Sequence, residues 1–363
     1  MNNSQDLTAY MSRSIDQIIR EAMTSALKNP RESAFLARFA LRQRRAGQKR
    51  AKSEQAGRHI PPFLIASIAS QCNLACKGCY ARANQSCGDQ PLTDTLSSGR
   101  WGELFTEAKE LGIAFILLAG GEPLLRRNVL RQAADRPEII FPIFTNGTLV
   151  DDDYLQLFNR HRNLLPILSL EGPAEATDDR RGMGAYATIL AVMTRLQAKL
   201  IFFGVSITVT KANLAVVTDR EFVAGLYAGG CRVLFYIEYV PVAPETRALA
   251  PEEPERQLLA ARMADLRAAC AGMILIAFPG DEHLTGGCLA AGRGFFHINA
   301  RGGAEPCPFS PFSDLSLKDR SLLDALDSPL FRRLNEEGLL LGEHAGGCTL
   351  FARESAVRGL LGG

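Results

Sequence analysis

The segment "CNLACKGCY" (72–80) places three cysteines, Cys72, Cys76 and Cys79, on one short stretch of chain. Thiolates bind zinc and iron–sulfur clusters. Structural zinc sites take four ligands, usually as two pairs, and no second pair lies near this segment. Three thiolates can instead hold three irons of a [4Fe–4S] cluster. We therefore expect a cluster whose fourth iron is open to a substrate or a cosubstrate.

A second set of three cysteines, Cys288, Cys307 and Cys348, lies near the end of the chain, each beside Gly or Pro. Such turn-like surroundings favour ligands over core thiols. A zinc site with three cysteines and a histidine is an alternative for this set. The candidates for a fourth ligand are His283, His344, Cys270 and Cys87, of which His344 is preferred. The other thiols read as one loop thiol and two core thiols: Cys87, Cys231 and Cys270.

The elements that position Cys72, Cys76 and Cys79 are strands and helices that alternate from residue 63 onward. Six short, nearly continuous apolar runs with helical patterns between most of them are typical of parallel strands covered on both faces. Polar motifs follow the runs at their ends, as in "SQCNLAC", "AGGEP", "TNGT" and "SLEGP". Strands that point such groups to one rim are typical of a β/α barrel. Six units predict an incomplete, TIM-like (β/α)6 barrel with a lateral opening.

The domains that we expect are a helical N-terminal extension with a basic linker over 1–60, the partial barrel over 61–279, and a smaller C-terminal domain over 280–363. Residues 1–60 carry 12 Lys and Arg against 5 Asp and Glu, although the chain of 363 residues has a net charge of only +2. No aromatic residue interleaves the basic run to stack on bases, so we do not expect a nucleic-acid partner.

The N-terminus lacks the apolar core of a signal peptide, and no apolar run is long enough for a membrane helix. We therefore expect a cytoplasmic protein with no membrane association. In that reducing compartment, nine cysteines indicate metal binding or reactivity rather than disulfides.

The cysteine loop resembles that of the radical S-adenosylmethionine (SAM) enzymes, whose pattern is C-x3-C-x2-C with an aromatic residue nearby. "GGEP" (120–123), "TNGT" (145–148) and "SLEGPAEATDDRRG" (169–182) are similar to the family's other strand-end motifs and stand in the family's order. The resemblance covers about residues 61–240. It implies that a reduced [4Fe–4S] cluster cleaves SAM to a 5′-deoxyadenosyl radical, which abstracts a substrate hydrogen.

The resemblance also implies which residues contact SAM. They are the backbone of Gly120, Gly121 and Glu122 at the amino group, Ser169 and Glu171 at the ribose, Arg181 at the carboxylate, Tyr80 at the adenine, and Asn146. The two glycines lack a Cβ and so permit close approach. Arg180 is a rival of Arg181, and "TNG" is equally an ordinary turn. The family more often has Asp at the position of Glu171.

The second cysteine set resembles the auxiliary-cluster domains of the family, called Twitch and SPASM, with too few cysteines for full SPASM. A second iron–sulfur cluster is implied, either with an open iron or with a fourth ligand from elsewhere.

The substrate that we expect is a peptide or protein, which the basic N-terminal segment could help to hold. The alternative is an oxidoreductase on a small molecule such as a sugar, a nucleotide or a cofactor precursor. A third hypothesis is a non-catalytic iron–sulfur sensor that binds SAM. Glu238, at the end of the sixth apolar run, should face the substrate, unless it is an exposed edge-strand carboxylate. The chain has no nicotinamide or flavin fingerprint, so a flavodoxin or ferredoxin is expected to supply electrons under anaerobic conditions.

Overall fold

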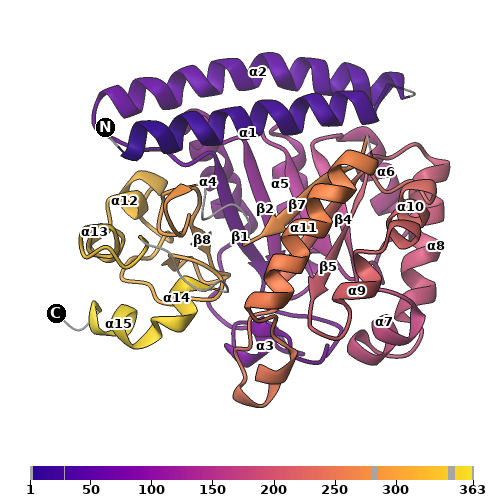
Figure 1. Ribbon diagram of the computed structural model, residues 1–363. Helices are drawn as coiled ribbons and strands as arrows, with labels where there is room; N and C mark the ends of the chain where they lie inside the picture. The colour runs from indigo at the N-terminus through magenta and orange to yellow at the C-terminus, as the bar shows by residue number, and fades with distance from the viewer. Residues whose placement is uncertain (1–2, 28, 271, 280–284, 342–347, 362–363) are drawn as a thin grey trace.

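The fold is described from a computed structural model, in which residues 3–27, 29–270, 272–279, 285–341 and 348–361 are described (Figure 1). Its centre is a nine-stranded sheet with the order β7-β6-β5-β4-β3-β2-β1-β8-β9. All neighbours pair in parallel except β8 and β9. The strands that match the six predicted apolar runs are β1 (Phe63–Ala69), β2 (Phe115–Gly120), β3 (Phe141–Thr145), β4 (Leu164–Leu170), β5 (Gly204–Val209) and β6 (Val233–Glu238). The predicted α/β fold with an incomplete barrel is confirmed.

A seventh parallel strand, β7 (Ile274–Phe278), was not predicted and extends the sheet beyond β6. A run of five apolar residues is too short for its pattern to distinguish a buried strand from a buried helix segment. Because β7 pairs with the edge of β6 that would otherwise be free, β6 is not the last strand of the sheet.

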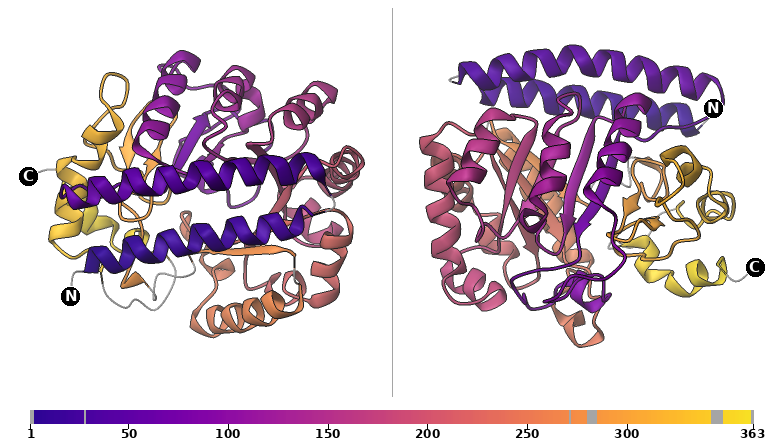
Figure 2. Two further views of the ribbon diagram at one scale, coloured as in Figure 1. Left: turned by 90° about the horizontal axis from the view of Figure 1, so that it is seen from above. Right: turned by 180° about the vertical axis from the view of Figure 1, so that it is seen from behind.

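Helices cover the outer face of the curled sheet, as the alternation predicted (Figures 1 and 2). Among the described residues no helix is long and apolar enough to cross a bilayer. The connecting helices are α3 (Tyr80–Ala83), α4 (Ser98–Leu111), α5 (Arg127–Ala134), α6 (Asp152–Arg160), α7 (Ala174–Arg181), α8 (Ala185–Ala198), α9 (Leu214–Val217), α10 (Arg220–Ala228) and α11 (Glu253–Ala269), with 3-10 helices η1 (Pro123–Arg126) and η2 (Pro244–Leu249).

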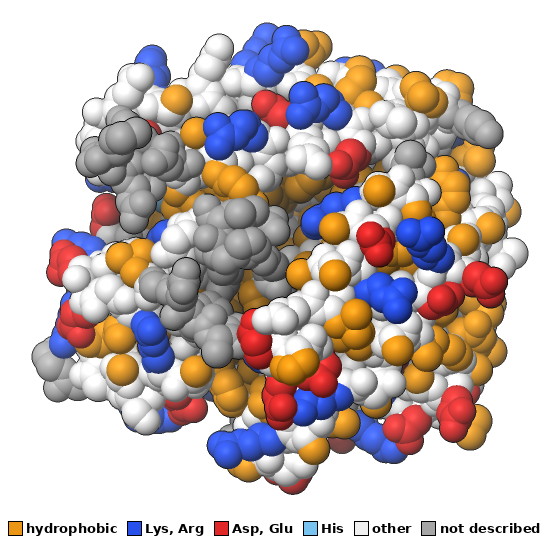
Figure 3. Space-filling view, viewed as in Figure 1, with side chains coloured by type: hydrophobic (Ala, Val, Ile, Leu, Met, Phe, Trp, Pro, Cys, Tyr) orange, Lys and Arg blue, Asp and Glu red, His pale blue; other side chains and the backbone are white. Residues whose placement is uncertain are grey.

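Several apolar side chains on the inner face of the barrel are only half-buried, whereas those on the outer face are buried under the helices. Alternation along each strand assigns the two faces. Phe144 and Phe235 meet across the interior with ring centroids 5.1 Å apart. Figure 3 shows a hollow between the C-terminal part and α11, with hydrophobic side chains around it. The half-buried inner residues form what we call the lumen: Ile65, Leu117, Phe144, Phe235, Ile237, Ile276 and Phe278.

The helices α1 (Asn3–Ser25) and α2 (Pro30–Gln55) lie side by side across one end of the barrel (Figure 2). Their apolar residues pack on the amino ends of the strands, where Phe39 is fully buried against Phe115 at the start of β2. The hairpin therefore closes the end of the lumen opposite the strand-end motifs.

The predicted basic linker is wrong, because α2 continues through the basic run to Gln55. Arg, Lys, Gln and Ala are good helix formers, so nothing in the run ends the helix. Arg50 is buried and donates to the Gly112 carbonyl, and Gln43 donates to the Glu138 carbonyl at 2.9 Å. These contacts tie the basic stretch to the barrel, at the end away from the cysteine loop. A role of this stretch in holding a peptide at the cysteine loop is therefore not supported.

The C-terminal part lies against β1 (Figure 1). It contains β8 (His297–Ile298), β9 (Ala304–Glu305), α12 (Leu322–Leu326), α13 (Pro329–Glu336), α14 (Thr349–Ala352) and α15 (Glu354–Gly359). β8 pairs with the free edge of β1, and the Phe295 ring packs on Phe278 of β7 with centroids 5.5 Å apart. This part thus contacts both strands that border the lateral opening. The predicted boundary at 279/280 stays a prediction, because 280–284 lie outside the described residues.

A buried chain of hydrogen bonds crosses the junction between β1, β8 and β9. The His297 ring shares one hydrogen bond with the Ser67 hydroxyl at 2.7 Å and another with the Glu305 carboxylate at 2.7 Å. Asn299 donates to the other oxygen of that carboxylate at 2.5 Å. Each of Ser67, His297 and Glu305 is less than a tenth exposed, so the polar groups satisfy one another away from water.

Replacing Phe39 with Ala should lower the free energy of unfolding by about 3–5 kcal/mol, because it opens a cavity between the helical hairpin and the barrel. Leu41→Ala is the matched control, because Leu41 is 62% exposed on the same helix and should change stability by about 0.5 kcal/mol or less. Urea denaturation followed by circular dichroism measures both. Equal effects would mean that the hairpin does not pack on the barrel.

Candidate active site

Backbone hydrogen bonds join the cysteine loop to three other segments on the rim opposite α1 and α2. Cys72 N donates to the Gly88 carbonyl at 2.9 Å, and Glu122 N donates to the Gln71 carbonyl at 2.8 Å. On the other side of the loop, Lys77 N donates to the Arg180 carbonyl at 2.8 Å. The loop is therefore held between the ends of β1 and β2 and the carboxyl end of α7.

The three thiols of the loop influence one another electrostatically. Burial raises the pKa of Cys72, and the neighbouring Cys76 and Cys79 raise it further. Burial also raises the pKa of Cys76, whereas the nearby Arg181 lowers it. None of the nine cysteines, all of which lie in the described residues, forms a disulfide. The thiols are thus partly exposed neighbours beside a cation.

Within the described residues, no group of three or more His, Cys, Asp or Glu converges on a point that would hold a single metal ion. A cubane takes each thiolate on a different iron, so its ligands surround a volume rather than a point. Three adjacent thiols on one partly exposed loop fit such a cluster.

The glycine pair after β2 is required by the chain itself. A Cβ on Gly120 would overlap the Ala69 carbonyl, and a Cβ on Gly121 would overlap the Gln71 carbonyl. Gly120 also has a φ of +121°. We expected these glycines to make room for a ligand, and the structure shows that they make room for the end of β1 and the start of the cysteine loop.

Glu122 is 1% exposed, and its carboxylate ties β2 to β3. It accepts from Asn146 N at 2.8 Å and from the Thr145 hydroxyl at 2.7 Å. Burial raises its pKa. Asn146 Oδ1 in turn accepts from Thr148 N at 3.0 Å, while its Nδ2 donates to Asn73 of the cysteine loop at 2.9 Å. The "TNG" motif is therefore a turn and also a support for the loop.

Ser169 and Glu171 differ in their surroundings, although both were expected at the ribose. Ser169 is half-buried on the inner face and lies 3.4 Å from the Ser206 hydroxyl. Glu171 is 2% exposed and pairs with both arginines at the end of α7. Of the two arginines, Arg180 also donates through Nε to the Lys77 carbonyl at 3.1 Å.

The second cysteine set also comes together in space. Cys288 and Cys307 are buried and Cys348 is partly exposed. Burial raises the pKa of Cys307, and a hydrogen bond and the charge of Cys348 together with the charge of Cys288 raise it further. The proposed fourth ligand His344 lies outside the described residues.

Tyr80, expected near the adenine, links the two cysteine sets. Its ring meets the Phe309 ring edge to face with centroids 5.0 Å apart. Tyr80 follows Cys79 directly, and Phe309 is two residues beyond Cys307. Burial raises the Tyr80 pKa, and the charges of Cys79, Cys87 and Cys307 add to that effect. The two sets therefore lie on either side of one aromatic contact.

The expectation that Glu238 faces the substrate is not supported by its position. On β6 it shares a face with the outer-core residues Leu234 and Tyr236, and it is 6% exposed. Its carboxylate accepts from Arg256 Nε of α11 at 2.8 Å. The alternative of an exposed edge-strand carboxylate is wrong for the same reasons, because β7 and α11 cover it.

Two residues of the site were missed by the sequence analysis. Tyr239 is buried, and a Cβ on Gly78, between the cluster cysteines, would collide with its hydroxyl. The Arg180 guanidinium lies 5.7 Å from the centroid of the Tyr239 ring. Cys87 is no ordinary loop thiol, because its hydrogen bond to Cys79 lowers the Cys79 pKa. Alternation could have placed Tyr239 opposite Glu238, whereas nothing local marked Cys87.

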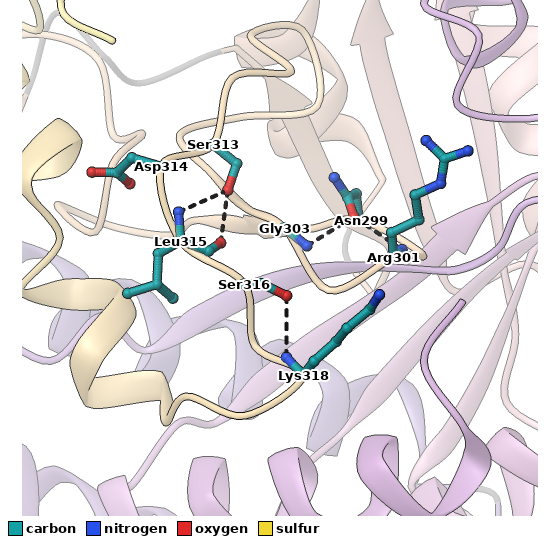
Figure 4. Close-up of a pocket in the computed structure, with 8 residues that line it drawn as sticks. All are labelled: Asn299, Arg301, Gly303, Ser313, Asp314, Leu315, Ser316 and Lys318. Atoms are coloured by element: carbon teal, nitrogen blue, oxygen red, sulfur yellow. Dashed lines mark hydrogen bonds between the residues drawn. The ribbon is translucent and has the colours of Figure 1, made fainter. Parts of the chain in front are cut away.

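A separate pocket of about 390 Å³ lies in the C-terminal part (Figure 4). Its polar groups bond largely to one another, since Asn299 Oδ1 accepts from Arg301 N at 3.0 Å and from Gly303 N at 2.9 Å. None of the predicted site residues lines this pocket, so we do not assign it to the site.

Comparison with known proteins agrees with the rim motifs. Residues 67–214 match the radical SAM superfamily. The chain is 25% identical to the AdoMet-dependent heme synthase of Methanosarcina barkeri over 78% of its own length and 87% of the relative. It is 24% identical to the PqqA peptide cyclase of Gluconobacter oxydans over 68% of its length and 70% of the relative. The crystal structure of Streptococcus suis SuiB bound to its precursor peptide SuiA superposes with a TM-score of 0.66 at 18% identity, over 83% of this chain and 75% of that chain.

Replacing Gly121 with Ala should displace the cysteine loop, because the new Cβ cannot coexist with the Gln71 carbonyl. We expect anaerobic reconstitution of this variant to incorporate about half or less of the wild-type iron and sulfide, or to leave the protein unfolded. Gly225→Ala is the control, because Gly225 is exposed in α10 with nothing near its Cβ, and Ala should stabilise that helix by about 0.5–1 kcal/mol. Full incorporation in the Gly121 variant would contradict the close packing.

Proposed function

We propose that this protein is a radical SAM enzyme that holds a [4Fe–4S] cluster on Cys72, Cys76 and Cys79. The observation that carries the proposal is the junction of the cysteine loop with the ends of β2 and α7, which brings three thiols beside the Arg181 cation on one rim. When bound, the cluster supplies the electron that cleaves SAM to methionine and a 5′-deoxyadenosyl radical, which abstracts a hydrogen atom from the substrate.

The chain's own residues bind and orient in this proposal. Arg181 receives the SAM carboxylate through its planar fork. Ser169, half-buried on the lumen side of β4, is the side chain within reach of the ribose. Asn146 and Glu122 keep the loop in place through the hydrogen bonds that join them to Asn73 and β3. The lumen below the rim keeps the reacting groups away from bulk water.

We further propose that Cys288, Cys307 and Cys348 hold an auxiliary iron–sulfur cluster in a Twitch- or SPASM-like domain over 280–363. The support is the mutual proximity of the three thiols and the contact of Tyr80 with Phe309, which sets the two cysteine groups side by side. A flavodoxin- or ferredoxin-type donor would supply the electrons. Nine cysteines without a disulfide fit a reducing compartment, the cytoplasm.

The substrate that we propose is a peptide. The PqqA peptide cyclase and the peptide-bound SuiB structure are the findings that support it. A peptide would enter from the rim, because α1 and α2 close the other end of the lumen.

A second candidate is a cofactor precursor of the tetrapyrrole class. The largely apolar, half-buried lumen favours it, since the inner face carries Ile65, Leu117, Phe144, Phe235 and Ile276, with the hydroxyls of Ser169 and Ser206 beside Phe235. One relative, of which this chain covers 87%, is named a heme synthase. Another, of which it covers 38%, is named an Fe-coproporphyrin III synthase.

The first test is formation of 5′-deoxyadenosine by anaerobically reconstituted protein with dithionite and SAM. The wild type should form it, and a variant with Cys72, Cys76 and Cys79 all changed to Ala should form none and should lack the matching electron paramagnetic resonance signal. A variant with Cys288, Cys307 and Cys348 changed to Ala should retain the first signal. Bound SAM that is never cleaved, with or without the candidate substrates, would favour the sensor hypothesis instead.

Iron coproporphyrin III separates the two substrate classes. If the substrate is a tetrapyrrole, this probe should shift its visible absorption on binding and raise the rate of 5′-deoxyadenosine formation. Phe235→Glu should abolish the absorption shift, because it places a charge in the apolar lumen. No shift and no acceleration would leave the peptide as the better proposal.

A further inference from the structure

We propose that Glu171 is a positioning residue: it fixes the Arg181 guanidinium in the orientation that receives the SAM carboxylate, and it does not contact the ribose. The inference rests on the proposed function, because it takes SAM as the bound cosubstrate. It changes the role that the family resemblance implied for Glu171 and leaves the ribose contact to Ser169.

Both oxygens of the Glu171 carboxylate are already occupied by guanidinium groups. One oxygen accepts from Arg181 Nε at 2.9 Å and from a second nitrogen of the same group, and the other accepts from Arg180 Nη1 at 2.7 Å. Because the residue is 2% exposed, a ribose hydroxyl has no open approach to it. Three charge-assisted hydrogen bonds already take most of the acceptor capacity of this carboxylate, and its burial leaves little room for a ribose hydroxyl.

The backbone of Glu171 is fixed as firmly as its side chain. Its N–H donates to the Thr177 hydroxyl at 3.2 Å, and its carbonyl accepts from Asn213 Nδ2 at 3.0 Å. Thr177 lies on α7, the helix that ends with the two arginines, and Asn213 lies just before α9. The carboxylate is therefore a rigid anchor for the end of α7.

Arg180 and Arg181 each donate through two of their three nitrogens, but only Arg181 directs both bonds to the same partner. Among the described residues, the hydrogen bonds of its side chain go only to Glu171, through two of its three nitrogens. Arg180 is committed on both sides, to Glu171 and to the Lys77 carbonyl. Since a guanidinium has five N–H donors, Arg181 keeps an edge for a second carboxylate.

Arg181 lies close to the cysteine loop, because α7 ends where Lys77 N of the loop donates to the Arg180 carbonyl at 2.8 Å. Burial lowers the Arg181 pKa, but the charges of Glu171 and of the Cys76 thiolate outweigh it and raise the pKa overall. Arg181 is thus the cation between a buried carboxylate and the loop thiols. A carboxylate bound at the open iron would meet a guanidinium that Glu171 has already oriented.

The test compares two ligands on the reconstituted protein by isothermal titration calorimetry. SAM carries the carboxylate, whereas 5′-methylthioadenosine keeps the adenine and the ribose but lacks the amino-acid part. In Glu171→Gln, the amide offers one acceptor where the carboxylate offered two, so Arg181 should lose its orientation. We expect SAM affinity to fall about tenfold and 5′-methylthioadenosine affinity to stay within about twofold.

The matched control is Glu32→Gln, which removes another buried carboxylate paired with an arginine. Glu32 is 2% exposed, and one of its oxygens lies 3.3 Å from Arg162 Nη1, away from the rim. This variant should bind both ligands like the wild type. Arg181→Gln should reproduce the selective loss of SAM affinity, and the double variant with Glu171→Gln should be no weaker than Arg181→Gln alone.

Equal loss of both ligands in Glu171→Gln would establish a ribose contact and overturn the inference, and so would no loss of either. If Glu171→Gln does not fold, Glu171→Asp provides the same comparison, because a shorter carboxylate still moves Arg181 and should weaken SAM alone by several-fold. A wild type that binds neither ligand would overturn the proposed function together with the inference. If the wild type binds SAM normally but Glu171→Gln loses both ligands equally or neither of them, only the inference about Glu171 is overturned.

Discussion

The pairing of β2 with β1 is the constraint on which the rim depends. The register runs without interruption from Phe63 opposite Phe115 and shifts between Ser67 and Ala69, so that Ala69 faces Gly120. Irregularities of this kind re-aim the chain at the ends of strands, often beside active sites. Here the shift directs the end of β1 across the glycine pair, and the cysteine loop starts from that crossing. Glu122, Asn146 and Arg180 then bond to a loop whose direction is already set.

The barrel separates its two ends by chemistry as well as by position. At the amino ends of the strands, aromatic and branched side chains fill the interior and two long helices seal it. At the carboxyl ends, backbone and carboxylate hydrogen bonds replace apolar packing, and the side chains of the lumen are only half-buried. This is the division that β/α barrels generally use, with stability at one end and chemistry at the other.

The parallel strands and the shared rim could be predicted from the sequence because they depend on local patterns. Continuous apolar runs predict covered parallel strands, and the motifs that follow them must share a rim once the strands are parallel. The failures concern contacts between distant segments. Glu238 was assigned to the substrate side because it ends the sixth apolar run, but its side chain points to the outer face, where Arg256 of α11 pairs with it. Alternation along β6 indicates the face of Tyr239 but not its contact with Gly78, and Cys87 reaches Cys79 only through the folded path of the chain.

The pairing of β8 with β1 has a consequence for how such proteins can be recombined. The buried Ser67 hydroxyl belongs to the barrel, while the His297 ring and the Glu305 carboxylate that complete its hydrogen bonds belong to the C-terminal part. A chimera that joined this barrel to the C-terminal part of a relative would leave the buried Ser67 hydroxyl without its partner unless the incoming segment carried an equivalent histidine, held in turn by an acid. The two parts are therefore expected to be inherited together, and the junction limits how freely evolution or an engineer can exchange one for another.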